Sequence, residues 1–312
     1  MVDLKIELPP HFLEGEMRNG YEVTPQAKAL WAIELDLLAE FNRVCKKYDL
    51  KYSATGGTML GAVRHHGFIP WDDDIDLMML RDDYERLCKI ASAEFKEPYF
   101  FQTEYTDPGS LRRHAQLRNS QTTAIRQVEE QWHYSFNQGI FIDIFPVDAV
   151  IDDKEKFQKQ RNEAMAMKKS YMEKAKWTVR YHDGPNVFKN VLKRTVKLAK
   201  NVIHRDHLDY QKDYHRFENI CARYNNEETK YLSLLSFQFD NPKHYKTRAG
   251  WQNIEYVPFE FMKIPITADY DEVLKIQYGD YMVMKQVGAI HGDLIIDTDH
   301  SYKDYWKRGN KK

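Results

Sequence analysis

Residues 53–76 read SATGGTMLGAVRHHGFIPWDDDID, and this stretch decides the fold class. Gly56 and Gly57 interrupt a strand-like segment, and Thr58–His65 then has the composition of a short helix. An apolar loop follows, after which Ile75–Leu80 is predicted to be a second strand. A strand, a glycine turn, a helix and another strand in direct succession predict an α/β protein.

Two carboxylates, those of Asp74 and Asp76, stand where the second strand begins. Residues i and i+2 of a strand face the same side, so the sequence predicts that these side chains converge. Carboxylates held close together repel each other unless a cation neutralises them, and oxygen-only ligands favour Mg²⁺ or Mn²⁺ over zinc. Gly56 and Gly57 let backbone N–H groups approach a phosphate at the start of a helix. The pattern therefore predicts a site for a metal ion and for phosphate groups.

Asp143 is a third acidic candidate. It lies within Ile140–Phe145, an otherwise apolar strand that is predicted to stop at Pro146. An unpaired charge in such a strand is costly, so its carboxylate needs a partner. Its predicted role is third metal ligand or general base for an acceptor hydroxyl, and a structural ion pair is the alternative explanation.

Charge and composition exclude several classes of protein. The chain of 312 residues has 46 basic and 47 acidic side chains and a net charge of −1, so we expect no nucleic-acid partner. Three widely separated cysteines make a disulfide framework or a zinc site improbable and favour a reducing compartment. The N-terminal sequence lacks the pattern of a signal peptide, and there is no long apolar run. We expect a cytoplasmic protein, at most peripheral at the inner face of the membrane.

The chain divides by composition into four parts. The sequence predicts an N-terminal arm at 1–24, an α/β catalytic core at 25–150, a helical lysine-rich segment at 151–230 and a C-terminal subdomain at 231–312 that completes the site. The core begins with a long amphipathic helix, which Thr24 and Pro25 start and which runs to about Tyr48.

Residues 187–203 combine apolar side chains at helical spacing with lysines and an arginine. Such a basic amphipathic helix fits an anionic membrane surface or an anionic glycan. An ordinary subdomain helix with one solvated face explains the same pattern.

The segments quoted above resemble a known family. Residues 52–87, Leu117–Ser120 and the segment GIFIDIFPVD at 139–148 are similar to the signature of the LicD family, the lipopolysaccharide cholinephosphotransferases, which are related to the fukutin-type transferases. The resemblance extends over 25–150 and, more loosely, over 255–291. It implies a nucleotidyltransferase-like mixed sheet, with a helical insertion and a C-terminal subdomain.

The resemblance also implies an activity. Members of the LicD family transfer phosphocholine, or a polyol phosphate, from a CDP-linked donor to a hydroxyl of a cell-surface glycan or its lipid-linked precursor. The metal ligands of the family fall on Asp74 and Asp76, and its later acidic residue falls on Asp143. The predicted phosphate-binding residues are Gly56, Gly57, Thr58, Arg64 and Arg118.

Simpler explanations exist for several of these residues. The acidic run 72–76 could be a solvated loop or a calcium site. Thr58 could only cap its helix, and Arg64 could be a solvated charge at the end of a helix. Trp71 could stack on a base or on a choline ammonium group, or simply pack in the core. His114 is expected to be a surface or otherwise satisfied histidine.

Two other functions are compatible with the same motifs. One is a nucleotidyltransferase that attaches the nucleotide itself to a small molecule or polymer. The other is a catalytically silent protein that binds a glycan or a nucleotide. The mass added to the acceptor distinguishes a nucleotidyltransferase from a phosphotransferase. Donor binding without turnover would identify a catalytically silent binding protein.

Overall fold

The computed structural model describes residues 1–132, 134–179, 191–193, 195–196, 198–199, 209–285 and 294–309. Its elements, in chain order, are β1 (Glu16–Arg18), β2 (Tyr21–Val23), α1 (Pro25–Lys47), β3 (Ser53–Ala54), α2 (Gly56–His65), β4 (Asp76–Leu80), α3 (Arg81–Glu94), β5 (Tyr99–Gln102), β6 (Ala115–Asn119), β7 (Thr123–Arg126), α4 (Gln127–Glu130), β8 (Ile140–Val150), α5 (Lys154–Trp177), α7 (Tyr210–Cys221), β9 (Tyr231–Ser233), β10 (Lys246–Thr247), α8 (Arg248–Gln252), β11 (Ile254–Phe259), β12 (Met262–Thr267), α9 (Tyr270–Tyr278), β13 (Leu294–Asp297) and α10 (Tyr302–Gly309).

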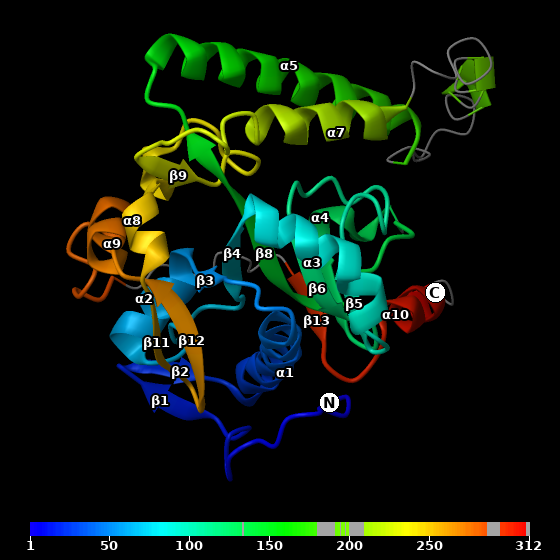
Figure 1. Ribbon diagram of the computed structural model, residues 1–312. Coiled ribbons are helices and arrows are strands. Elements are labelled where there is room, and N and C mark those ends of the chain that lie inside the picture. The colour runs from blue at the N-terminus through cyan, green and yellow to red at the C-terminus, as the bar shows by residue number, and fades with distance from the viewer. Residues whose placement is uncertain are drawn as a thin grey trace.

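A mixed sheet organises the fold, and β8 runs through its middle (Figure 1). β8 pairs in parallel with β4 on one side. On the other side it pairs antiparallel with β6 and then, farther along, with β9. β3 and β10 lie at the ends of this path, and β5 extends the sheet beyond β6. The mixed sheet and its covering helices confirm the predicted α/β class.

β8 does not stop at Pro146, so the prediction that this strand ends there was wrong. The antiparallel ladder with β6 ends at Ile144, and the ladder with β9 begins at Asp148. Pro146 lies between them, where no strand among the described residues pairs with that side of β8. A proline is tolerated in a strand at such a position because its missing N–H breaks no ladder hydrogen bond.

Helix α1 is the main helix packed against the sheet. Thr24 caps it by accepting a hydrogen bond from the Ala27 N–H at 3.2 Å, and the helix ends at Lys47, as the sequence predicts. It packs on β6 and β8, while α3 packs on β4, β5 and β8. The apolar side chains between these layers form the principal core, which includes Trp31, Phe41 and Ile144.

A second apolar cluster lies above the sheet, where α5 and α7 run side by side (Figure 1). Tyr171, Tyr214 and Phe217 are buried in it. Most of the stretch 187–203 lies outside the described residues, so the predicted basic amphipathic helix stays a prediction. In the parts of the chain that the structure describes, none of the helices combines the length and the apolar character that crossing a membrane requires.

Candidate active site

The acidic segment meets the sheet at the start of β4. Asp76 is the first residue of β4, and Asp74 lies on the loop just before it, so the prediction that both stand on one strand was wrong. Their carboxylates nevertheless line one cavity of about 460 Å³, together with Asp72 and Asp143. Asp76 and Asp143 are register partners in the parallel pair of β4 and β8. Two neighbouring strands therefore bring together acids that are far apart in the sequence.

The glycine pair begins α2 on another side of the same cavity. Gly56 has φ +57°, in the left-handed region that glycine adopts without strain. A Cβ atom on Gly57 would lie 2.7 Å from a carboxylate oxygen of Asp72, so only glycine lets Asp72 approach this closely. The Thr58 hydroxyl accepts a hydrogen bond from the Asp76 N–H at 2.8 Å, which ties α2 to the start of β4.

Asp143 is held in place by neighbours from β6 and the residues before it. The Gln116 amide donates a hydrogen bond to Asp143 Oδ1 at 2.5 Å, and His114 Nε2 lies 3.2 Å from the same oxygen. Arg118 donates in turn to the side-chain oxygen of Gln116 and to that of Gln102. Arg118 thus positions Gln116, and Gln116 orients the carboxylate.

The charges in this cavity are unbalanced. Burial raises the pKa of Asp76 well above its usual value, and the charges of Asp74, Asp143 and Asp72 raise it further. Burial also acts to raise the pKa of Asp143, but the charge and hydrogen bond of His114 and the hydrogen bond of Gln116 outweigh it, so this pKa is lowered. Close carboxylates of this kind are stabilised by a proton or by a cation.

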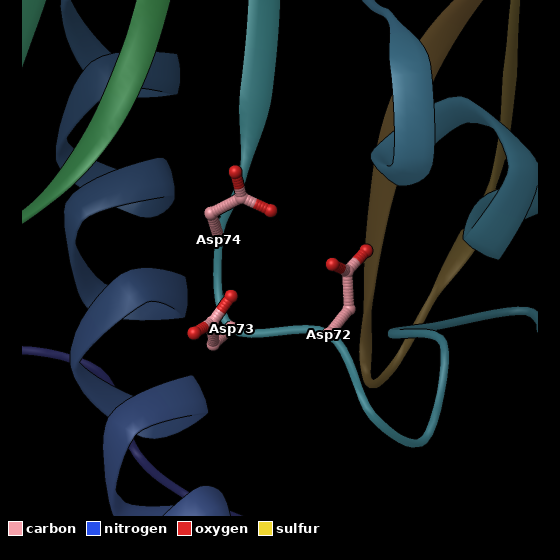
Figure 2. A group of neighbouring side chains, drawn as sticks. All are labelled: Asp72, Asp73 and Asp74. Carbon is pink, nitrogen blue, oxygen red and sulfur yellow. The ribbon is translucent and has the colours of Figure 1, made fainter. Parts of the chain in front are cut away.

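A further group of carboxylates lies on the loop beside α1. Asp72, Asp73 and Asp74 each offer an oxygen within 4.8 Å of those of the other two, and Figure 2 shows Asp72 and Asp74 directed toward the space between them. Trp31 on α1 donates its indole N–H to the backbone oxygen of Asp72 at 2.9 Å. One turn farther along α1, Glu34 is 1% exposed.

Glu34 adds to the excess of negative charge. Burial raises the pKa of Glu34 well above its usual value. The charges of Asp74, Asp73, Asp72 and Asp143 raise it further. Its Oε2 atom has no hydrogen-bond partner within the described ranges. A set of carboxylate oxygens with an orphaned buried oxygen nearby fits a hard divalent cation such as Mg²⁺ or Mn²⁺.

The rest of the cavity wall is basic and aromatic. Arg112 and Arg126 line it, with Phe141, Phe145 and Tyr278. The Arg112 guanidinium carbon lies 5.9 Å from the centre of the Phe141 ring. Guanidinium groups suit phosphate oxygens and aromatic rings suit a flat base, so this wall fits a nucleotide diphosphate.

Three predicted phosphate-binding residues do not line this cavity: Thr58, Arg64 and Arg118. The Thr58 hydroxyl is engaged by the Asp76 N–H. Arg64 donates to the backbone oxygen of Tyr281 at 2.7 Å and does not line the cavity. Arg118 is fully buried, and burial lowers its pKa to about 9. It donates to Gln116 and lies 4.7 Å from the centre of the Phe141 ring, whereas Arg112 and Arg126 line the cavity itself.

Sequence reasoning missed several residues of the site. Arg112, Arg126 and Tyr278 come from loops and strand ends that only the folded chain brings together. His114, expected to be a surface or otherwise satisfied histidine, is largely buried and has Asp143 as its partner, which places it at the cavity. The i, i+2 spacing of His114, Gln116 and Arg118 was a usable signal, because alternate residues of a strand share a face. Gln116 and Arg118 lie on β6, and His114 directly precedes it.

Comparison with known proteins places the cavity in a known context. Residues 49–182 match the family model LicD/FKTN/FKRP, nucleotidyltransferase domain. The chain is similar to the lipopolysaccharide cholinephosphotransferase LicD of Haemophilus influenzae, with 27% identity over 80% of this chain and 88% of that protein. It is also similar to an uncharacterised protein of Rickettsia prowazekii, RP689, with 39% identity over 30% of this chain and 32% of that one. The matched region contains Gly56, Gly57 and the acids of the cavity.

Proposed function

We propose that this chain, which is similar to the LicD family, is a metal-dependent phosphotransferase that acts on a CDP-linked donor and a glycan hydroxyl. Transfer of phosphocholine is the activity named for the relative from Haemophilus influenzae. Transfer of a polyol phosphate is the alternative within the family resemblance. One observation carries the proposal: Asp72, Asp74, Asp76 and Asp143 share a cavity with Gly56 and Gly57, while Arg112 and Arg126 line its wall.

The acidic and the basic side chains of the cavity would bind different parts of the donor complex. A divalent cation held by Asp74, Asp76 and Asp143 would neutralise the donor diphosphate. Arg112 and Arg126 would contact the outer phosphate oxygens, and the backbone N–H groups at the start of α2 add a favourable partial charge. Phe141 and Phe145 offer apolar surface to the base. Positioning and charge compensation then account for most of the catalysis.

In the proposed reaction the acceptor hydroxyl oxygen attacks the donor phosphorus that carries the headgroup. The new P–O bond forms as the bond to the bridging oxygen breaks, and CMP leaves with that oxygen. The hydroxyl proton passes to a base near the attacking oxygen. Asp143 stays ionised at neutral pH because His114 and Gln116 lower its pKa, so it can serve as metal ligand or as proton acceptor.

A donor screen tests this proposal. CDP-choline, CDP-ribitol and CDP-glycerol are incubated with the protein and Mg²⁺, with and without an oligosaccharide acceptor, and CMP release is measured. We expect release of CMP from one donor and loss of this release with EDTA. The mass of the product decides the reaction type: an added phosphoester headgroup supports phosphotransfer, whereas an added nucleotide identifies a nucleotidyltransferase. Calorimetric binding of CDP-choline with no CMP release would instead support a silent binding protein.

A further inference from the structure

The lysine-rich segment 187–203 has no part in the proposed function, but its sequence separates two kinds of side chain. In a helical projection with about 3.6 residues per turn, the apolar positions fill one half of the circumference. These positions are Val187, Phe188, Val191, Leu192, Val196, Leu198, Ala199, Val202 and Ile203. The basic residues Lys189, Lys193, Arg194, Lys197 and Lys200 fall on the opposite half. No acidic residue lies between Asp183 and Asp206, so the charge of this half is entirely positive.

The described residues of this segment expose their apolar side chains. Residues 191–193, 195–196 and 198–199 are helical. The relative exposure is 59% for Val191, 65% for Leu192, 36% for Val196 and 66% for Leu198. In the projection these four positions reach from one edge of the apolar half to the other, and none of them belongs to either apolar cluster of the fold. An ordinary subdomain helix turns its apolar half toward a core, and these described residues do not.

The segment connects α5 and α7 at one end of the layer that these two helices form (Figure 1). Gln160, in the first half of α5, donates to the backbone oxygen of Ile220 near the end of α7 at 2.7 Å. Lys174, near the end of α5, lies 2.6 Å from the carboxylate of Asp213 near the start of α7. The two helices are therefore antiparallel, so the chain leaves the layer and returns to it at the same end. These contacts between α5 and α7 are made without any residue of 187–203.

An anionic bilayer matches both halves of this segment. Apolar side chains enter the boundary between headgroups and acyl chains, while lysine and arginine reach the anionic headgroups. A soluble polyanion would use the basic half alone and would leave the apolar half in water. A groove on a partner protein reads a narrower stripe of apolar anchors than half a circumference. A helix over 187–203 would be about 25 Å long, which is shorter than the roughly 30 Å hydrocarbon core of a bilayer, so it would lie along the surface.

We infer that segment 187–203 binds the surface of an anionic phospholipid bilayer, with its apolar half in the membrane and its basic half among the headgroups. The inference goes beyond the proposed function, because it concerns where the protein acts and not which group it transfers. The attachment is reversible and depends on anionic lipid, since a surface helix is held by buried apolar area and by electrostatic attraction.

Vesicle flotation of the full chain tests this inference without requiring turnover. One set of vesicles contains phosphatidylcholine alone, and the other contains phosphatidylcholine and phosphatidylglycerol in equal amounts. We expect the protein to float with the anionic vesicles and to bind the neutral ones at least about tenfold more weakly, because basic side chains gain affinity only near anionic lipid. Absence of binding to the anionic vesicles would overturn the inference, and so would equal binding to both sets.

Two double variants test the two halves of the segment separately. Lys193→Gln/Lys197→Gln removes two positive charges and should weaken binding to anionic vesicles at least about tenfold. Leu192→Gln/Leu198→Gln keeps the charge, removes two exposed apolar side chains and should weaken binding by a similar factor.

Matched controls make the same exchanges elsewhere on the surface. Lys156→Gln/Lys159→Gln alters two exposed lysines of α5, and Met17→Gln/Val128→Gln alters two exposed apolar residues. Both controls should bind like the wild type. Binding that depends on the lysines of 187–203 but not on its leucines would indicate a purely electrostatic contact with a polyanion and would refute insertion. Binding that neither double variant changes would place the membrane contact elsewhere and refute the assignment.

CMP release without vesicles separates failure of this inference from failure of the proposed function. None of the exchanged residues lines the acidic cavity, so we expect both double variants to release CMP from a soluble donor at the wild-type rate. CMP release by a protein that ignores anionic vesicles would overturn the membrane contact and leave phosphotransfer intact. Vesicle binding that both double variants weaken, with no CMP release from any donor, would support the membrane contact and count against the proposed activity.

Discussion

Asp143 and Asp148 lie on the same strand, β8, and both are buried, but their surroundings differ. Asp148 accepts two hydrogen bonds from Arg81, at 2.9 and 2.6 Å, and a third from Asn225 at 2.9 Å. Asp143 instead faces Asp76 across the parallel pair, within a cavity that also holds Asp72 and Asp74. The protein supplies the counter-charge of Asp148 itself, whereas the acidic cavity has more carboxylates than cations to match them.

This difference separates a charge that the protein neutralises with its own side chains from one that it leaves near other acids. In a buried pair such as Arg81 and Asp148, each charge neutralises the other, so no ligand is needed to stabilise them. The carboxylate of Asp76, whose pKa is raised by burial and by its acidic neighbours, is stabilised by a proton or by an external cation. The alternative explanation of Asp143 as a structural ion pair therefore describes its neighbour Asp148 better than Asp143 itself.

The largest expected effect comes from the unbalanced region. Asp76→Asn removes one proposed metal ligand and should lower the rate of CMP release by about 10³-fold or more. The same change relieves repulsion among buried acids, so the metal-free variant should unfold at the same or a higher temperature than the wild type. Scanning calorimetry with EDTA measures the second effect. Activity near the wild-type level would contradict the metal assignment.

The balanced region should respond in the opposite way. Arg81→Met leaves Asp148 buried without its counter-charge and should cost about 3–5 kcal/mol of unfolding free energy. The double variant Arg81→Met/Asp148→Leu should recover most of this loss, because both charges are then gone. Urea unfolding of the wild type, Arg81→Met, Asp148→Leu and the double variant gives the four free energies of the cycle. An Arg81→Met protein as stable as the wild type would mean that the pair has no structural role.

These two regions also indicate what the sequence could predict. Local sequence patterns indicate a turn, the start of a strand and an acid within an apolar strand. These patterns made it possible to recognise the glycine pair, Asp74, Asp76 and Asp143. The basic wall was not, because Arg112 and Arg126 enter the site through the pairing of β6 with β8 and of β7 with β13. Arg118 was predicted to bind phosphate because arginine is suited to it. On β6, however, its side chain donates hydrogen bonds to Gln116 and Gln102.

A third buried charge sharpens the comparison. Lys246 is 1% exposed, and burial lowers its pKa from 10.5 to about 8, although Asp269 acts in the other direction. Between pH 8 and 10.5 the unfolded chain therefore binds more protons than the folded one, so stability rises with pH across this window. Relative to Lys246→Met, the unfolding free energy of the wild type should rise by about 3 kcal/mol. Urea unfolding at several pH values measures the difference, and parallel curves for the two proteins would contradict the lowered pKa.

The smallest of these effects concerns how Asp143 is oriented. Gln116→Ala removes the amide that holds Asp143 Oδ1 and should reduce turnover by about 10- to 100-fold. Loss of metal affinity should accompany the loss of turnover, which isothermal titration with Mn²⁺ can measure. Gln121→Ala, at an exposed turn near the end of the same strand, is the matched control. If both variants retain wild-type Mn²⁺ affinity, Gln116 does not orient a metal ligand.

The pairing of β13 with β7 has a consequence for how the enzyme is made. Leu294 lines the acidic cavity and residues 296–300 line a second cavity, whose wall also includes Asp72, and Ser301 and Tyr302 anchor the following chain by hydrogen bonds to Ser120 and Thr122. A ribosome delivers these residues long after the sheet strands β4, β6 and β8. A nascent chain can therefore bury its sheet while both cavities still stand open, and β7 remains a free edge that other chains can pair with until the last segment arrives.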